Sequence, residues 1–145
     1  MTQSQLATIF VDRHFPHPPR QVWRALTDPE LLAKWWAPGN IAPTVGHEFE
    51  LDMGNWGMVP CRIIESRPGE FLSYTFGESW TLSWRLEAEG DGTRLYLEQS
   101  GLDLSKPNDR FAYDQMGAGW RGTVLPRLGD VLDVLGEGYA GSSLA

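Results

Sequence analysis

The segment from residue 22 to residue 36, VWRALTDPELLAKWW, restricts the fold of this chain more than any other segment. Proline disfavours helical geometry in the residue before it and suits the first turn of a new helix, so Asp28 and Pro29 predict a break between two short helices. Asp28 is the expected N-cap of the second helix, and Glu30 lies near the positive end of its dipole. The second helix then presents an apolar face on barely three turns, formed by Leu31, Leu32, Trp35 and Trp36. A larger element of the chain must cover a face this wide.

The length and charge of the chain limit its class. At 145 residues and 16.3 kDa it is long enough for one domain that buries about two-thirds of its unfolded surface. We expect that domain to occupy residues 1–136 and a frayed tail to occupy residues 137–145. The net charge is −7 and the Lys and Arg residues are scattered, which disfavours nucleic acid as a partner.

No stretch approaches the roughly 20 consecutive apolar residues of a membrane span, and the N-terminus lacks a basic region followed by an apolar run. We therefore expect no membrane span and a cytoplasmic protein. The single cysteine, Cys61, cannot form an internal disulfide and is expected to be a small buried residue in a strand. The histidines, His14, His17 and His47, do not have zinc-ligand spacing, so neither a metal nor another cofactor is expected.

Six segments have the two-residue period or the turn boundaries of strands. In the clearest of them, Glu48, Glu50 and Asp52 alternate with apolar side chains, which is typical of an antiparallel strand with one solvated face. Glycine-containing turns separate the later strands as hairpins, so the sheet is predicted to be an antiparallel meander. The predicted strands are residues 6–15, 46–53, 58–66, 71–76, 80–87 and 94–100.

Residues 109–135 return to helical spacing, with Met116, Trp120 and Val124 among the apolar residues on one side. Four glycines in this stretch each lower helix propensity by up to about 1 kcal/mol, so tertiary packing must hold the helix. Pro126 lacks an N–H and would crowd the carbonyl of residue 122, which predicts a kink. A kinked helix on a curved sheet leaves space beneath it.

The predicted order of a strand, two short helices, a five-strand meander and a long helix is accompanied by motifs over nearly the whole chain. They are Phe15-Pro-x-Pro-Pro, Val22-Trp23-x-Ala25, Thr27-Asp28-Pro29-Glu30, Trp35-Trp36, Gly92-Thr93-Arg94-Leu95-x-Leu97 with Ser100-Gly101, and Gly119-Trp120 with Leu125 and Leu128. In combination these motifs resemble the activator-of-heat-shock-protein-90-ATPase-like (AHSA-type) family. That family is part of the START and birch-pollen-allergen-like (SRPBCC) helix-grip superfamily.

The resemblance implies an α+β helix-grip fold, in which a curved antiparallel sheet grips a long C-terminal helix and the two enclose an apolar cavity. It implies less about function, because the superfamily includes lipid carriers, polyketide cyclases, hydrolytic enzymes and co-chaperone domains.

The residues themselves also favour a ligand-binding cavity. Seven tryptophans are a high density for this length, and most fall on elements that would face the space between sheet and helix or its rim. Gln99 shares a strand face with Leu95 and Leu97, so it is expected to point inward, at a place where the family often has histidine. The alternative is that these side chains only fill the core. The predicted ligand-binding residues are Trp35, Trp36, Phe49, Leu51, Trp56, Tyr74, Trp84, Gln99, Tyr113, Met116 and Trp120.

Candidates for acid–base catalysis are few. His47 shares the face of Phe49, although its position at the start of a strand is also typical of an exposed residue. Glu65 shares parity with Cys61 and Ile63, which predicts an inward carboxyl with a shifted pKa that a cyclase could use as a base. No G-x-S-x-G nucleophile elbow is present.

Three functions fit these observations. We expect a protein that binds a hydrophobic or aromatic small molecule, such as a lipid or a polyketide, rather than an enzyme. The first alternative is a polyketide cyclase, aromatase or hydrolase. The second is a co-chaperone-like regulator of a heat-shock protein 90 ATPase, which only the family resemblance supports. The protein is expected to be a monomer or a weak homodimer.

Overall fold

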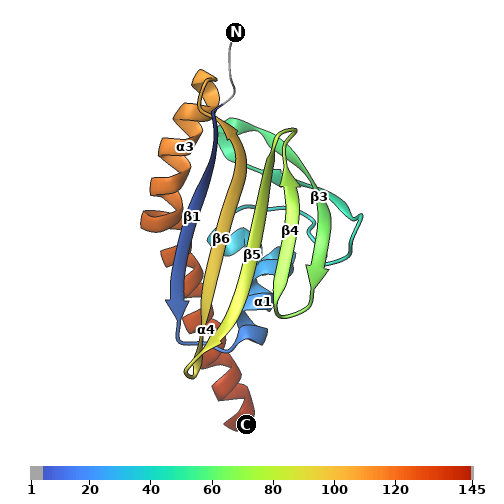
Figure 1. The fold of residues 1–145 in the computed structure, drawn as a ribbon. Helices are drawn as coiled ribbons and strands as arrows, with labels where there is room; N and C mark the ends of the chain where they lie inside the picture. The colour runs from blue at the N-terminus through green and yellow to red at the C-terminus, as the bar shows by residue number, and fades with distance from the viewer. Residues whose placement is uncertain (1–4, 145) are drawn as a thin grey trace.

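A computed structural model describes the backbone of residues 5–144 and the side chains of residues 5–135. The chain forms a six-stranded antiparallel sheet with helices packed against it (Figure 1). The strands are β1 (Leu6–Phe15), β2 (Glu48–Asp52), β3 (Met58–Arg67), β4 (Phe71–Phe76), β5 (Trp80–Glu89) and β6 (Gly92–Asp103). The helical segments are α1 (Pro19–Thr27), α2 (Pro29–Trp35), the 3-10 turn η1 (Gly54–Trp56), α3 (Pro107–Gly119), the π turn η2 (Trp120–Val124) and α4 (Leu125–Leu144).

The strands follow the order β1-β6-β5-β4-β3-β2 across the sheet. Strands β2 to β6 form the predicted meander, and β1 pairs with β6 along its length, from Leu6 opposite Asp103 to Phe15 opposite Thr93. All six predicted strands are present. β6 is longer than predicted because it has hydrogen-bonding partners on both sides, β1 and β5.

The break between α1 and α2 has the predicted chemistry. The side chain of Asp28 accepts a hydrogen bond of 2.9 Å from the backbone N–H of Glu30, and Pro29 is the first residue of α2. Trp35, at the end of α2, is 1 % exposed, and its indole N–H donates to the carbonyl of Ala25 over 2.9 Å. This bond ties α2 to α1 and turns the apolar face of α2 toward the core.

The long C-terminal helix is divided by a π turn. In η2 the N–H of Leu125 bonds to the carbonyl of Trp120, five residues earlier. The sequence predicts a kink at Pro126. The π turn ends at Val124, two residues before Pro126, and Pro126 cannot donate the next backbone hydrogen bond. α3 packs on β1 and β6, whereas α4 packs on α1 and α2 (Figure 1).

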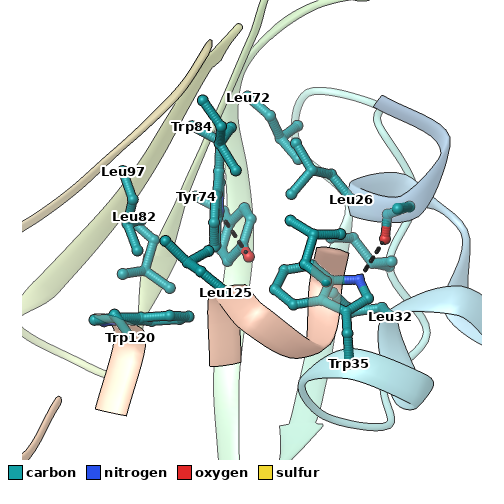
Figure 2. Close-up of a cluster of buried hydrophobic side chains, with 14 of the residues drawn as sticks. Leu26, Leu32, Trp35, Leu72, Tyr74, Leu82, Trp84, Leu97, Trp120 and Leu125 are labelled. Carbon is teal, nitrogen blue, oxygen red and sulfur yellow. Dashed lines mark hydrogen bonds between the residues drawn. The ribbon is translucent and has the colours of Figure 1, made fainter. Parts of the chain in front are cut away.

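Side chains from the sheet and the helices fill the centre of the molecule (Figure 2). Trp84 of β5 meets Trp120 edge to face, with ring centroids 5.5 Å apart, and its indole N–H donates to the hydroxyl of Tyr74 over 3.1 Å. Leu125, from the start of α4, packs beside them. The middle of the helix grip is therefore solid core rather than cavity.

None of the described helices has the length and apolarity needed to cross a membrane. The predicted tail over 137–145 begins within the last turns of α4, and its side chains lie outside the described residues. The domain boundary at residue 136 therefore stays a prediction.

Candidate functional site

A pocket of about 600 Å³ lies between α3 and one end of the sheet. Val59 near the start of β3, Phe76 at the end of β4 and Trp80 at the start of β5 meet at this end because the three strands are antiparallel. The helical wall consists of Asn108, Asp109, Phe111, Ala112, Gln115, Met116 and Gly119 of α3, with Trp120 and Val124 of η2. The lining is completed by Trp36, Met53 and Trp56.

Stacked aromatic rings form the sheet side of the pocket. The rings of Trp36 and Phe76 are 5.7 Å apart and 24° from parallel, and those of Phe76 and Trp80 are 6.1 Å apart and 8° from parallel. Trp120 closes the inner end, with its ring centroid 5.0 Å from that of Trp36. Such a row of rings gives the pocket an apolar aromatic wall that suits a ring-containing ligand.

Small side chains on α3 explain why space remains at this end of the molecule. Ala112 and Gly119 line the pocket, and a Cβ atom placed on Gly119 would meet nothing within 4 Å. In α4 the corresponding inner positions carry leucines that are 1 % exposed or less, Leu125, Leu128 and Leu132. The α4 half of the helix therefore fills the core, whereas the α3 half leaves a pocket.

Two exposed aromatic side chains border the pocket on its outer side. Trp56 of η1 is 74 % exposed and Phe111 of α3 is 52 % exposed, and their rings are 6.1 Å apart. The turn that carries Trp56 lies between Gly54 and Gly57, whose φ angles of 64° and 81° lie in the left-handed region that favours glycine. These two rings give the pocket an apolar rim.

Asp109 is the one charged residue among the described side chains that line the pocket. Its Oδ2 atom accepts a hydrogen bond of 2.9 Å from the backbone N–H of Asp103 and one of 3.5 Å from the indole N–H of Trp80. No lysine or arginine of the described side chains is part of the lining. The described side chains of the lining therefore offer no cationic partner for an anionic group.

A buried polar pair lies behind the inner end of the pocket. Gln99, which is fully buried, accepts a hydrogen bond of 2.9 Å from the indole N–H of Trp120 at its Oε1 atom. The Nε2 atom of the same amide donates to the sulfur of Met116 over 3.2 Å. The predicted inward orientation of Gln99, on the face of Leu95 and Leu97, is confirmed.

Two buried groups with raised pKa values, the Cys61 thiol and the Tyr74 hydroxyl, lie outside this pocket. Burial raises the pKa of the Cys61 thiol to about 12, and Cys61 is buried in β3 as predicted. Burial also raises the pKa of the Tyr74 hydroxyl far above its ordinary value, although its hydrogen bond with Trp84 opposes the shift. Both groups are protonated at neutral pH.

The structure divides the predicted ligand-binding residues into two sets. Four of them line the pocket: Trp36, Trp56, Met116 and Trp120. Six are buried in the core outside the pocket lining: Trp35, Phe49, Leu51, Tyr74, Trp84 and Gln99. Tyr113 is partly buried on α3 and is not part of the lining. The binding roles of all eleven residues stay predictions.

The two candidate catalytic residues do not line the pocket. The Nε2 atom of His47 donates to the carbonyl of Asn40 over 2.6 Å in an exposed position. The expectation that Glu65 points inward is wrong, because the β3–β4 register shifts between Ile63 and Glu65 and reverses the alternation. Glu65 is exposed and pairs with Arg67 over 3.2 Å.

Several pocket residues were not among the predicted ones. The missed positions on the helical wall are Asn108, Asp109, Phe111, Ala112, Gln115, Gly119 and Val124, and most of them have another lining residue three or four positions away. That spacing is the signal that could have identified them, since it marks one face of a helix. Trp80 is one of the tryptophans expected to face the space between sheet and helix or its rim, but the predicted ligand-binding residues include neither Trp80 nor Phe76.

The described residues contain no cluster of three or more His, Cys, Asp or Glu side chains that could hold a metal ion. The pocket therefore offers apolar contact and a few polar groups as its means of recognition.

Comparison with known proteins places the chain in a family. Residues 16–133 match the family model described as Activator of Hsp90 ATPase homolog 1-like protein. The chain belongs to this family. Membership in the Activator of Hsp90 ATPase homolog 1-like family, together with the six-stranded sheet and long C-terminal helix, confirms the predicted α+β helix-grip fold. No curated protein was found to match the chain.

Solved structures share this fold. Protein MLL2253 from Mesorhizobium loti is 32% identical, with a TM-score of 0.79 over 88% of this chain and 97% of its own. Protein BH1534 from Bacillus halodurans is 24% identical, with a TM-score of 0.79 over 90% of this chain and 99% of its own. DynU16, a protein of the dynemicin biosynthetic locus, is 24% identical, with a TM-score of 0.73 over 87% of this chain and 47% of its own.

Proposed function

We propose that this protein binds an uncharged, ring-containing apolar molecule in the pocket between α3 and the sheet. The observation that carries the proposal is the row of stacked rings formed by Trp36, Phe76 and Trp80 along a pocket of about 600 Å³. Ligand pockets of proteins have volumes of about 300–1,000 Å³ and linings that are mostly apolar and aromatic. The volume of this pocket falls in that range, and its lining is likewise mostly apolar and aromatic.

The charge of the site supports a neutral ligand over an anionic one. Asp109 contributes the lining's one negative charge among the described side chains, and the protein carries a net charge of −7. An anionic group that enters the pocket would lose its hydration without gaining a cationic partner. Free carboxylic and sulfonic acids are therefore expected to bind poorly.

A pair of fluorescent probes tests both parts of the proposal. N-phenyl-1-naphthylamine is neutral, and 8-anilinonaphthalene-1-sulfonate has the same ring system with a negative charge. We expect the neutral probe to bind with saturation and the sulfonate to bind at least about tenfold more weakly, measured by fluorescence titration. Equal affinity for the two probes would contradict the role given to charge.

Two glycine substitutions show whether the probe occupies this pocket. Gly119→Leu places a side chain in the pocket, whereas Gly122→Leu is the matched control, because Gly122 lies outside the lining. A Cβ atom at either position meets nothing within 4 Å, so the two substitutions begin from equally open positions; circular dichroism checks that both variants fold. We expect Gly119→Leu to weaken binding of the neutral probe by about tenfold or more and Gly122→Leu to leave it unchanged. Equal effects of the two changes would overturn the proposed site.

The two alternatives have less support. A cyclase or hydrolase would need acid–base groups at the ligand, and the predicted candidates His47 and Glu65 lie outside the pocket lining. Regulation of a heat-shock protein 90 ATPase rests on the family's description alone. A cytoplasmic location and a monomer or weak homodimer likewise remain predictions from the sequence.

A further inference from the structure

We propose that the ligand carries a hydrogen-bond acceptor, such as a ring ketone, which takes the place of the Met116 sulfur on the amide of Gln99. This inference rests on the proposed function and specifies the ligand chemistry. Gln99, Met116 and Trp120 contact one another at the inner end of the pocket.

The orientation of the Gln99 amide is determined by Trp120. An indole N–H can only donate, so the atom of Gln99 that lies 2.9 Å from it must be the carbonyl oxygen Oε1. The NH₂ group must then point to the opposite side, where the sulfur of Met116 lies 3.2 Å from Nε2. Met116 and Trp120 both line the pocket. The amide donor is therefore directed at a residue of the pocket wall.

The Gln99 donor has a poor partner for a fully buried group. A thioether sulfur is a weak acceptor, whereas buried amide N–H groups are normally paired with oxygen. The amide has two protons, and the Met116 sulfur is the partner that the described side chains give its nitrogen. An oxygen acceptor in place of that sulfur would satisfy the donor better.

Met116 can move aside more easily than its neighbours in the wall. Its side chain has three rotatable bonds and adapts to irregular space, and it is only partly buried. Trp120, by contrast, is 1 % exposed and is held by its bond to Gln99. Met116 therefore acts as a movable cover between the pocket and the Gln99 donor.

A ligand oxygen is a better occupant of this place than water. A buried water needs two to four polar partners, and the rings at the inner end of the pocket, Trp120 and Trp36, offer mainly apolar surface. A carbonyl on a flat ring needs only the one donor, while its ring lies against the aromatic wall. The expected ligand class is therefore a neutral polycyclic ketone or a related ring compound with an inner acceptor.

Fluorenone and fluorene test this inference, because they share one tricyclic shape and differ by a carbonyl oxygen. Their affinities are measured by displacement of N-phenyl-1-naphthylamine from the wild type, Gln99→Met and Met116→Leu. Gln99→Met keeps the length of the side chain and removes the donor. We expect it to weaken fluorenone binding about tenfold and fluorene binding less than twofold. If Gln99 had a purely structural role, Gln99→Met would weaken the binding of both ligands equally. That result would overturn the inference.

Met116→Leu removes the sulfur and keeps an apolar side chain. The wild-type preference for fluorenone, relative to fluorene, should persist or increase in this variant, because the ligand oxygen is then the better available acceptor. Loss of the preference in Met116→Leu would overturn the inference.

The carbonyl stretching band of fluorenone gives a readout that needs no variant. A hydrogen bond from Gln99 lowers this frequency, so the band of fluorenone bound to the wild type should lie below its position in an apolar solvent. An unshifted band would overturn the inference even if Gln99→Met failed to fold. If the neutral probe binds but fluorenone binds no more tightly than fluorene, only the inference fails. If neither the probe nor the two tricyclic compounds bind, the proposed function fails as well.

Discussion

Each of three buried tryptophans has a hydrogen-bond acceptor for its indole N–H. Trp35 donates to the carbonyl of Ala25, Trp84 to the hydroxyl of Tyr74 and Trp120 to the amide of Gln99. These bonds allow large aromatic side chains to fill the core without unpaired donors. The same bonds determine how each ring is oriented, and for Trp120 this orientation shapes the inner end of the pocket.

Removing one of these acceptors should destabilise the protein. Tyr74→Phe leaves the N–H of Trp84 buried without its acceptor, and we expect it to lower the free energy of unfolding by about 1–3 kcal/mol in urea denaturation. Tyr113→Phe is the matched control, because Tyr113 is only partly buried, and it should change stability by less than about 0.5 kcal/mol. Similar losses in both variants would contradict this account of the Tyr74–Trp84 bond.

Burial of Cys61 predicts a loss of stability at alkaline pH. Its thiol has a pKa of about 12 in the folded protein, against an ordinary value of 9.0. As the pH rises above 9, the unfolded chain therefore loses this proton first and is stabilised relative to the folded state. The contribution of Cys61 to the free energy of unfolding should fall by about 1.4 kcal/mol between pH 8 and pH 10.

Cys61→Ala isolates this contribution. The stability difference between the wild type and this variant, measured by urea denaturation, should be about 1.4 kcal/mol smaller at pH 10 than at pH 8. A difference that does not change with pH would show that the thiol does not titrate as its burial implies.

Within single elements, local signals decide where helices begin and how they continue. Asp28 and Pro29 begin α2, and Pro126 follows a π turn that divides the long helix. The residues on either side of that turn differ in size, since α3 carries Ala112 and Gly119 on its inner face. One continuous helical segment thus has a pocket-lining part and a core-filling part.

The cap of α2 can be tested directly. Asp28→Ala removes the acceptor of the Glu30 N–H and should lower the free energy of unfolding by about 1 kcal/mol. Asp28→Asn keeps a capping oxygen, so its effect should be less than half as large. Thermal denaturation of the two variants compares them, and an equal loss in both would indicate that the carboxylate charge matters more than the cap.

For the whole molecule, the pocket lies between α3 and the end of the sheet where β3, β4 and β5 meet. Phe76 of β4, Trp80 of β5 and Trp36 after α2 supply its aromatic wall, and α3 supplies its small residues. A ligand that binds only the folded protein must stabilise the entire domain by mass action.

Ligand binding should therefore raise the melting temperature. With N-phenyl-1-naphthylamine at ten times its dissociation constant, the stabilisation is about 1.4 kcal/mol, which corresponds to a rise of roughly 3–6 °C. Gly119→Leu at the same probe concentration should show a much smaller rise in differential scanning calorimetry. An equal rise in that variant would mean that the probe binds elsewhere.

The sequence by itself determined the elements of this protein. Strand and helix periods, the Asp28-Pro29 break and the turn glycines are local patterns, so all six strands and the two short helices could be predicted from them. The inward orientation of Gln99 and the family resemblance also followed from the residues. The burial of Trp35, Trp84 and Trp120 fits the same patterns.

Only the tertiary structure decided how these elements combine. The pairing of β1 with β6 joins distant segments, and the shift between Ile63 and Glu65 depends on how β3 pairs with β4, so neither has a local signature. The place of the pocket was decided in the same way. Periodicity shows which side of an element is apolar, but the space left between two such sides depends on the side chains that meet across it. Here leucines of α4 close that space, and Ala112 and Gly119 of α3 leave it open.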